Sequence, residues 1–462
     1  MTTRVDAPLD RRVWRIAFVI VFGAFASGLD ASLTNIGLST IGTDLRAGLA
    51  QVQWVANGYL VAMAVSLPLC GWLTRRIGAG RLWLYALACF TVASGLCATA
   101  TGLMWLVALR IVQGLAAGLL VPAGQTVLGQ AVGKDRLGRM MSTLGIVVSL
   151  APALGPVVGG VLLHSLAWPW LFLINLPIGV VGLLLGLRVI PRGQPGASTR
   201  LDWLGFAWIG LGLPLVLYGL TVPATIALIV GALALLAFGL RTARRPNPLL
   251  DLTVYRNRGY LLATLATGCG GALMFGSALI FPLYFENLHH DPALTAGIRL
   301  LATGLGTGTI VPIAGRLTDR HGGGLIATIG AACALATTIP FALLGADANP
   351  VLIEVLLALF GMAIGLTILP PSIVAFKAVR TDQLPDATTQ ISIVQRVGGA
   401  IGGAVFTVVL SEHLAADRLH AFQLTFWLLA GTAALTLVLS GLLYRAGRCH
   451  TDRVLDDKLN RP

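Results

Sequence analysis

Long, almost uninterrupted apolar runs follow one another along this chain and restrict its fold more than any other feature. A helix that crosses the hydrocarbon core of a bilayer needs about 20 mostly apolar residues. Because no water is available there, a spanning segment must be a helix or a strand of a closed barrel. Barrel strands alternate apolar and polar residues over short segments, whereas these runs are long and unbroken. The sequence therefore predicts an all-α integral membrane protein.

Hydropathy divides the chain into fourteen predicted transmembrane helices, most of them joined by short loops. The longest loops, at residues 188–200 and 241–258, flank the seventh and eighth helices. The fourteen predicted helices begin near Val13, Gln53, Leu82, Trp105, Leu137, Trp168, Trp203, Ala224, Gly259, Ala293, Leu325, Val351, Ile391 and Leu424.

Positive charges fall in alternate loops, in step with this count. Of the 32 Lys and Arg residues, 27 lie at the termini and in every second loop, whereas the opposite loops carry only Arg46 and Arg418. The other three, Arg110, Arg299 and Arg396, fall inside apolar runs. Since Lys and Arg accumulate in cytoplasmic loops, we predict a multi-pass protein of a bacterial-type cytoplasmic (inner) membrane with both termini in the cytoplasm.

Composition and motifs exclude several classes of function. The formal net charge of +13 would suit a nucleic-acid-binding protein, but in a membrane protein the excess Lys and Arg report topology, so no nucleic-acid partner is predicted. The 6 cysteines have the spacing of neither a disulfide framework nor a zinc site. No phosphate-binding loop, His-Glu-x-x-His pair or Gly-x-Ser-x-Gly elbow occurs. We therefore predict no enzyme activity, no metal and no cofactor.

Two short motifs recur at nearly the same offset. Gly71–Gly80 (GWLTRRIGAG) matches Gly315–Gly324 (GRLTDRHGGG) at six of ten positions, 244 residues later, and Gly155–Gly160 recurs as Gly398–Gly403 at an offset of 243. Parallel repeats of this kind build many secondary transporters. The predicted domains are a six-helix half at 1–190, two inserted helices with their linkers at 191–258, a second six-helix half at 259–445 and a cytoplasmic tail at 446–462.

The order of motifs along the chain resembles the major facilitator superfamily. The resemblance rests on Trp54–Tyr59 (WVANGY), Arg110–Gly114 (RIVQG), the Gly155-Pro156 motif and the repeated Gly-x-Leu-Thr loops. Leu29–Asn35 (LDASLTN) and Trp168–Gly179 (WPWLFLINLPIG) are similar to its fourteen-span drug:proton antiporters, of the quaternary-ammonium or multidrug efflux type. The resemblance covers nearly the whole chain and implies two six-helix halves plus two inserted helices.

Three ionisable residues are candidates for proton coupling. Asp30 lies in the first predicted helix and Arg110 in the fourth, and charged groups at such positions are functional by default. A carboxylate at Asp30 suits reversible protonation, and the resemblance implies that Arg110 takes part in proton transfer. The alternatives are a solvated Asp30 and an Arg110 that snorkels to the headgroups. Glu354, about one turn inside the twelfth helix, is either a second titrating group or an interfacial carboxylate.

Glycine-rich motifs are predicted to serve the conformational change. Small residues on the fifth helix allow close helix packing, and the resemblance implies that this motif marks an exporter; its residues are Gly155, Pro156, Gly159 and Gly160. The repeated loop motif supplies Gly71, Arg76 and Gly78 in the first half and Gly315, Asp319 and Arg320 in the second.

Arg75 departs from the loop motif of the family. The resemblance implies an aspartate at this position that latches one conformation, and Asp319 keeps that pattern in the second half. The replacement puts a normal latch in the first half in doubt. A plain topology signal is the other interpretation of Arg75.

The substrate cavity is assigned by resemblance alone, to the first, fourth, fifth, ninth, tenth and twelfth helices. Methionine and aromatic residues suit a pocket that repacks around varied apolar ligands, although ordinary helix packing is the alternative for each of them. For Arg396 the alternative is structural pairing. The candidate cavity residues are Gln113, Gln125, Met274, Phe275, Tyr284 and Arg396.

The sequence thus predicts a proton-coupled antiporter that exports amphipathic drugs or antiseptics by alternating access. Its energy source is the proton gradient, and its partners are the lipid bilayer, small amphipathic substrates and protons. Whether a periplasmic adaptor is a further partner is not determined by the sequence. One alternative is a dedicated exporter of a single endogenous metabolite, lipid or siderophore. A non-transporting membrane sensor or scaffold is the alternative from another class. Deep carboxylates are scarce, which argues against polycationic substrates.

Overall fold

Helices make up the architecture, as the apolar runs predict. The computed structural model describes residues 11–132, 136–193, 201–221, 224–245, 248–291, 293–345, 349–414 and 417–459, and within these ranges it contains helices and no strand. Each of the predicted transmembrane segments coincides with one helix or with two helices separated by a short break.

The first eight helices pack as one group. In this group α1 packs on α6 and α8, and α5 packs on α2 and α4. A bend of 58° separates α2 from α3, at Pro68, whose ring and missing N–H interrupt a helix. The helices of the first group are α1 (Arg11–Asp44), α2 (Leu49–Ser66), α3 (Leu69–Ile77), α4 (Ala79–Cys97), α5 (Leu103–Val132), α6 (Leu137–Ser165), α7 (Trp170–Leu173) and α8 (Asn175–Val189).

Two helices then precede a second group of six. Helices α9 (Trp203–Thr221) and α10 (Thr225–Arg244) pack on each other, and α9 also contacts α2 and α15. In the second group, α14 packs on α11, α12 and α13, and α16 packs on α11, α13 and α15. After the short helix η2 (Leu252–Arg256), this group consists of α11 (Arg258–Asn287), α12 (Ala293–His321), α13 (Gly323–Leu343), α14 (Pro350–Ala378), α15 (Leu384–Leu414) and α16 (Arg418–Leu459).

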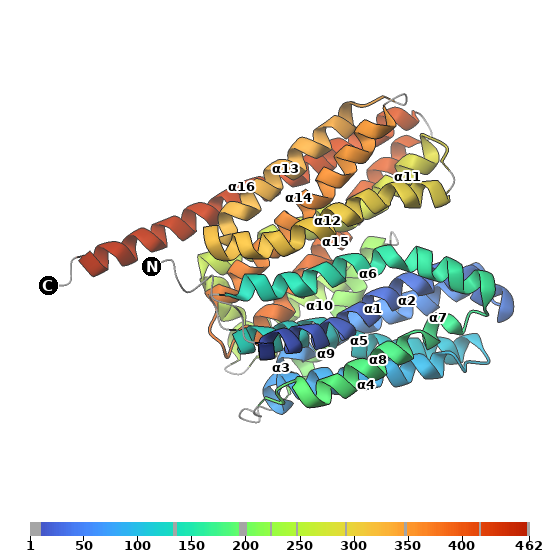
Figure 1. The fold of residues 1–462 in the computed structure, drawn as a ribbon, viewed down its shortest axis with the longest axis horizontal. Coiled ribbons are helices and arrows are strands. Elements are labelled where there is room, and N and C mark those ends of the chain that lie inside the picture. The colour runs from blue at the N-terminus through green and yellow to red at the C-terminus, as the bar shows by residue number, and fades with distance from the viewer. Residues whose placement is uncertain are drawn as a thin grey trace.

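The number of membrane spans is close to the prediction. Among the described residues, 12 helices are long and apolar enough to cross a membrane, and the bent pair α2–α3 brings the number to 13. The predicted number is fourteen. The predicted segment that is not among these 13 spans is α6, which is 29 residues long. The predicted tail after residue 445 is no separate segment in this structure, because α16 continues through it to Leu459 and projects beyond the other helices (Figure 1).

The two groups of helices meet mainly at one end of the molecule. Helix α6 packs against α12, and α3 and α5 pack against α15. Figure 1 shows the groups close together near the start of α1 and farther apart at the opposite end. We call the end where α1 begins the predicted cytoplasmic end, because the charge distribution predicts that it faces the cytoplasm.

The repeated loop motif folds into the same backbone turn in both groups. Gly78 precedes α4 with φ 92° and ψ 142°, and Gly322 precedes α13 with φ 86° and ψ 138°. A positive φ with an extended ψ is essentially restricted to glycine. The surroundings differ, because a Cβ atom at Gly78 would lie 2.5 Å from the Arg192 carbonyl oxygen, whereas one at Gly322 would have no atom within 4 Å.

This difference predicts unequal effects of alanine at the two turns. We expect Gly322→Ala to cost about 1–3 kcal/mol of stability through backbone strain alone, and Gly78→Ala to cost more because of the added contact with Arg192. Thermal unfolding of the purified protein, followed by fluorescence, checks the order of the two midpoints. Equal midpoints would show that the loop around Arg192 yields without cost.

Candidate functional site

A network of polar side chains is buried among the helices of the first group. Asp30 comes from α1, Arg110 and Gln113 from α5, and Asn175 from the start of α8, and all four are fully buried. The structure thus brings together Asp30 and Arg110, two of the residues that the sequence marks as candidates for proton coupling. The structure therefore excludes a solvated Asp30 and an Arg110 that reaches the headgroups.

Asp30 accepts hydrogen bonds on both carboxylate oxygens. Oδ2 accepts from Arg110 Nη1 at 2.6 Å, and Oδ1 accepts from Gln113 Nε2 at 3.0 Å and Asn175 Nδ2 at 2.8 Å. Charge-assisted hydrogen bonds of this kind are stronger than neutral ones. A proton on Asp30 would remove the charge that all three donors face, so the network can register the protonation state of this one carboxyl group.

Arg110 is held by further contacts from α2 and α5. Its Nε donates to the Val55 carbonyl oxygen at 3.0 Å, and its Nη1 also donates to Gln113 Oε1 at 2.7 Å. The guanidinium carbon lies 4.1 Å from the centroid of the Tyr59 ring. This close approach of α2 to α5 depends on Gly114, since a Cβ atom there would collide with the Tyr59 carbonyl oxygen.

Asn175 connects the network to α4, and its hydrogen bond to Asp30 was not predicted from the sequence. Besides Asp30, its Nδ2 donates to Ser94 Oγ at 3.1 Å, while its buried Oδ1 has no hydrogen-bond partner among the described residues. Asn175 lies within Trp168–Gly179, one of the motifs that resemble the family. A single uncharged amide, however, barely changes the mean hydropathy of an apolar run. The short break between α7 and α8, at Ile174, directs this amide into the network.

The other candidate residues lie apart from Asp30. Glu354 is exposed on the first turns of α14, Tyr284 is buried in an aromatic cluster with Phe341 and Phe426, and Phe275 is exposed on α11. Met274 packs partly against the core of the second group, and Gln125 on α5 is half-buried, with its Oε1 lacking a hydrogen-bond partner among the described residues. The structure brings only Gln113 of the candidate cavity residues into contact with the buried pair, and the cavity roles of the others stay predictions.

The glycines of α6 allow α1 to approach closely. A Cβ atom at Gly155 would collide with Ser32 Oγ, and one at Gly159 would lie 3.2 Å from Leu33 Cδ2. Gly160 is exposed, with open space at its Cβ position, and the side chain of Pro156 lies outside the described residues. Close packing of the predicted small-residue face is therefore observed at two of its glycines.

Asp319 joins the two groups at the predicted cytoplasmic end. Its carboxylate accepts hydrogen bonds from the backbone N–H groups of Gly138 and Arg139 at 3.1 and 2.9 Å, at the start of α6. A helix N-terminus is a favourable place for a negative charge. Lys377 Nζ also donates to Asp319 at 2.8 Å, and Gly315 permits α6 and α12 to touch, since a Cβ atom there would collide with the Gly138 carbonyl oxygen. Arg320 is exposed.

Arg75 makes the corresponding contact in the first group, where a cation stands in place of the aspartate. Its Nη1 lies 2.6 Å from Asp386 Oδ1 on α15, and the side chain of Asp386 is only 5% exposed. A Cβ atom at Gly71 would collide with the same carboxylate oxygen. Arg76, on the neighbouring position, is exposed and stacks on Trp72 at 5.1 Å. Arg75 thus does more than report topology, and its partner Asp386 was not predicted from the sequence.

The linker before α11 reinforces the contact of α3 with α15. Asp251 accepts a hydrogen bond from Gln383 Nε2 at 2.9 Å, and its carbonyl oxygen accepts from Gln390 Nε2 at 2.8 Å. Burial works to raise the pKa of Asp251, but hydrogen bonds from Thr253 and Gln383 and the nearby charge of Arg75 outweigh it and lower the pKa below its usual value. The linker is therefore tied to the start of α15.

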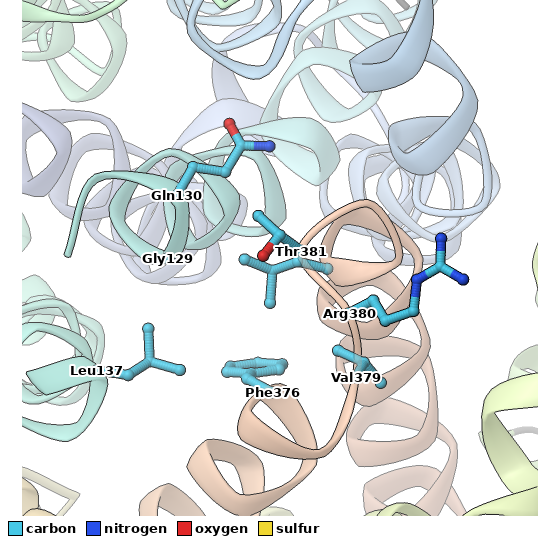
Figure 2. Close-up of a pocket in the computed structure, with 8 residues that line it drawn as sticks. Gly129, Gln130, Leu137, Phe376, Val379, Arg380 and Thr381 are labelled. Carbon is cyan, nitrogen blue, oxygen red and sulfur yellow. The ribbon is translucent and has the colours of Figure 1, made fainter. Parts of the chain in front are cut away.

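A small cavity lies at this end and not beside Asp30. Figure 2 shows that its walls come from the end of α5, the start of α6 and the connection between α14 and α15. Its volume of about 90 Å³ is far below the 300–1,000 Å³ typical of pockets for drug-sized ligands. The residues that line it are Gly129, Gln130, Leu137, Phe376, Val379, Arg380, Thr381 and Leu384.

Comparison with known proteins agrees with this architecture. The family model of the Major Facilitator Superfamily matches residues 20–403. A "Multidrug resistance protein B homolog" of Mycobacterium tuberculosis is 33% identical over 417 residues, which cover 87% of this chain and 77% of that protein. The "Riboflavin transporter RibZ" of Clostridioides difficile is 26% identical over 449 residues, 94% of this chain and 98% of that protein.

A solved structure shows the same fold. The crystal structure of the human organic anion transporter MFSD10 superimposes with a TM-score of 0.67 at 15% identity, over 94% of this chain and 100% of that one. Since the family model covers most of the sequence and the multidrug resistance homologue matches most of both chains, this chain belongs to the Major Facilitator Superfamily of transporters.

Proposed function

We propose that this protein is a proton-coupled antiporter that exports amphipathic compounds by alternating access. The observation that carries the proposal is the buried ion pair between Asp30 and Arg110, which are 0% exposed and 2.6 Å apart. The names of multidrug resistance relatives support the substrate class, and the proton gradient is the proposed energy source, with no cofactor.

The chemistry of the pair suggests how a proton would change the conformation. Protonation neutralises Asp30 and leaves the buried cation of Arg110 without its counter-ion, which is a costly arrangement. The helices that bring Val55 and Tyr59 against Arg110 must then rearrange or admit water. The two protonation states therefore favour different packings of α1, α2 and α5, and a proton gradient can drive the exchange.

The arrangement of helices supports an outward-facing state. Asp319 and Arg75 hold α6 and α15 at the predicted cytoplasmic end, and the groups lie farther apart at the opposite end (Figure 1). Rocking of the proposed halves, residues 1–190 and 259–445, would release these contacts and close the other end. The substrate site would then open to one side and the other in turn, as alternating access requires.

We also propose fourteen spans, with α6 as the fourteenth. Its 29 residues are long enough to cross a bilayer, and it lies between α1 and α12. Fourteen spans place both termini on the side with the excess of Lys and Arg, which by the positive-inside rule is the cytoplasm. The proposed location is the cytoplasmic (inner) membrane, with the inserted segment 191–258 between the halves.

A dedicated exporter is the second candidate function. It is favoured by the match to the riboflavin transporter, which extends over 98% of that protein. Such an exporter would use the same proton site but accept a narrow set of substrates. Competition between a dye and a panel of unrelated compounds separates the two, because only a multidrug exporter is inhibited by many of them.

Asp30→Asn is expected to abolish substrate-driven proton movement. The asparagine is similar in size but does not titrate, so we expect the rate of proton release in inverted membrane vesicles to fall by at least about tenfold. The measurement is dissipation of a preformed pH gradient, read with a fluorescent indicator, after addition of dyes, antiseptics or antibiotics. Equal amounts of folded protein are confirmed by size-exclusion chromatography.

Glu354→Gln is the companion variant, because it removes a carboxylate that the structure leaves exposed and away from Asp30. Full activity in Glu354→Gln and none in Asp30→Asn would support coupling at Asp30. Proton release that survives Asp30→Asn and disappears in Glu354→Gln would overturn the assignment to Asp30. If no compound of the panel caused proton release by the wild-type protein, multidrug export would be refuted.

A further inference from the structure

Arg396 lies in a predicted span and has no counter-ion among the described residues. Three arginines fall within apolar runs, and two of them are paired, Arg110 with Asp30 at 2.6 Å and Arg299 with Asp291 at 2.9 Å. Arg396 is half-buried on α15 and makes neither a hydrogen bond nor an ion pair with any residue that the structure describes. A guanidinium in a membrane interior without a partner is costly, and such groups mark functional sites.

The side of α15 that bears Arg396 faces the first group of helices. On this side Asp386 pairs with Arg75 in α3, and Thr389 lies beside the Cys70 thiol of α3. Arg396 follows Thr389 after seven residues, a spacing that keeps the same side of a helix. Tyr59 of α2, the helix that precedes α3, lies near Arg396. Arg396 therefore lies between the two groups of helices.

The same side of α15 borders open space about two helical turns farther from the predicted cytoplasmic end. Gly403, seven residues farther along the same side of α15, would bear a Cβ atom with no other atom within 4 Å. The opposite side of the helix is filled, because Gly398 and Gly402 pack tightly against Gly268 and Ala272 of α11. Arg396 thus lies on the side of α15 that is turned away from α11 and toward the first group, and major facilitator transporters bind their substrates between their two halves.

Arg396 is a positive charge that the described residues leave uncompensated. The nearby Asp30 and Arg110 neutralise each other within the first group, whereas Arg396 has no acidic partner among the described residues. A guanidinium presents a planar set of N–H donors that matches carboxylate, sulfonate and phosphate groups. An anionic group of a ligand would supply the missing counter-ion.

We propose that the transported compounds carry an anionic head group, which Arg396 binds, on an otherwise apolar body. This inference rests on the proposed transport function and specifies its substrate class. Tyr59 lies between the two sites, because its ring faces Arg110 at 4.1 Å and its side chain is also near Arg396. The bound anion therefore lies one aromatic side chain away from the network of Asp30.

Binding to the purified protein tests the proposal without a proton gradient. The probes are three pyrene amphiphiles that share one body, namely pyrenebutyrate, pyrenebutyramide and pyrenebutyl-trimethylammonium, with affinity read from pyrene fluorescence. We expect the carboxylate to bind at least about tenfold more tightly than the amide, and Arg396→Gln to bring the two to equal affinity. Arg396→Lys should keep part of the preference because it keeps the charge.

Arg299→Gln is the matched control, since it removes one arginine that already has a carboxylate partner. It should leave the preference for the carboxylate unchanged. Arg396→Gln should also unfold at or above the wild-type temperature, because it removes an unpaired charge, whereas a structural arginine would lower that temperature when replaced. The proposal is overturned if the amide or the ammonium binds as well as the carboxylate, if no carboxylate binding is seen up to millimolar concentration, or if Arg396→Gln retains the preference. Because the assay needs no gradient, loss of proton coupling and loss of anion recognition are distinguished.

Discussion

Replacement of Arg110 by leucine is expected to destabilise the protein by about 3–5 kcal/mol, because Asp30 would be left buried without its counter-ion. The variant also loses the hydrogen bonds from Arg110 to the Val55 carbonyl oxygen and to Gln113. Thermal unfolding of the purified variant beside the wild-type protein measures this loss.

The control is Arg299→Leu, which removes an arginine from a more exposed ion pair. Arg299 and Asp291 keep 18% and 15% of their side-chain surface exposed, and pairs with access to water contribute about 1 kcal/mol or less. The double variant Asp30→Asn with Arg110→Leu should recover part of the stability lost in Arg110→Leu, since no unpaired charge remains. An Arg110→Leu protein that unfolds at the wild-type temperature would refute the buried pair.

Arg75→Glu is expected to open the contact between α3 and α15. The change places a second carboxylate opposite Asp386, which is nearly buried, and like charges at an interface cost several kcal/mol. Cys70, fully buried at this contact, is a native reporter. In a protein whose other cysteines are serine, we expect maleimide to modify Cys70 at least about tenfold faster than without the change.

Two variants make this result specific. Arg76→Glu makes the same change of charge at the neighbouring residue, which is exposed and stacks on Trp72, so Cys70 should stay protected. Asp386→Asn combined with Arg75→Glu removes the repulsion and should restore most of the protection. Modification of Cys70 at an unchanged rate in Arg75→Glu would mean that the ion pair does not hold the two helices together.

The helical segments could be predicted closely because the bilayer imposes their length and their polarity. The predicted starts at Val13, Leu137 and Ala293 lie within two residues of the observed helices. The bend at Pro68 and the break at Ile174 were not predicted, since neither changes the mean hydropathy of its segment. The extension of α16 to Leu459 was also missed, because its polar residues were interpreted as a tail.

The charged residues of the site could be predicted because they interrupt apolar runs, whereas the neutral side chains that complete the site could not. Asp30 and Arg110 stand out in apolar runs, whereas Asn175 does not, although it donates to the same carboxylate. Asp386 was missed because the predicted helix begins near Ile391, which places this acid in the preceding loop, whereas α15 begins at Leu384. A single sequence also does not tell whether an aromatic residue such as Tyr284 faces a cavity or packs among other rings, as it does with Phe341 and Phe426, and its cavity role stays a prediction.

The two copies of the loop motif differ in how ionic strength should act on them. The Arg75–Asp386 contact joins two side chains, and Arg75 keeps 28% of its side-chain surface exposed, so mobile ions in solution can compete for the arginine. The Asp319 side chain is 3% exposed and is bound mainly by backbone N–H groups, whose dipoles mobile ions screen much less. Added salt would therefore weaken the contact of α3 with α15 before that of α6 with α12, and the two groups of helices would begin to separate from one side.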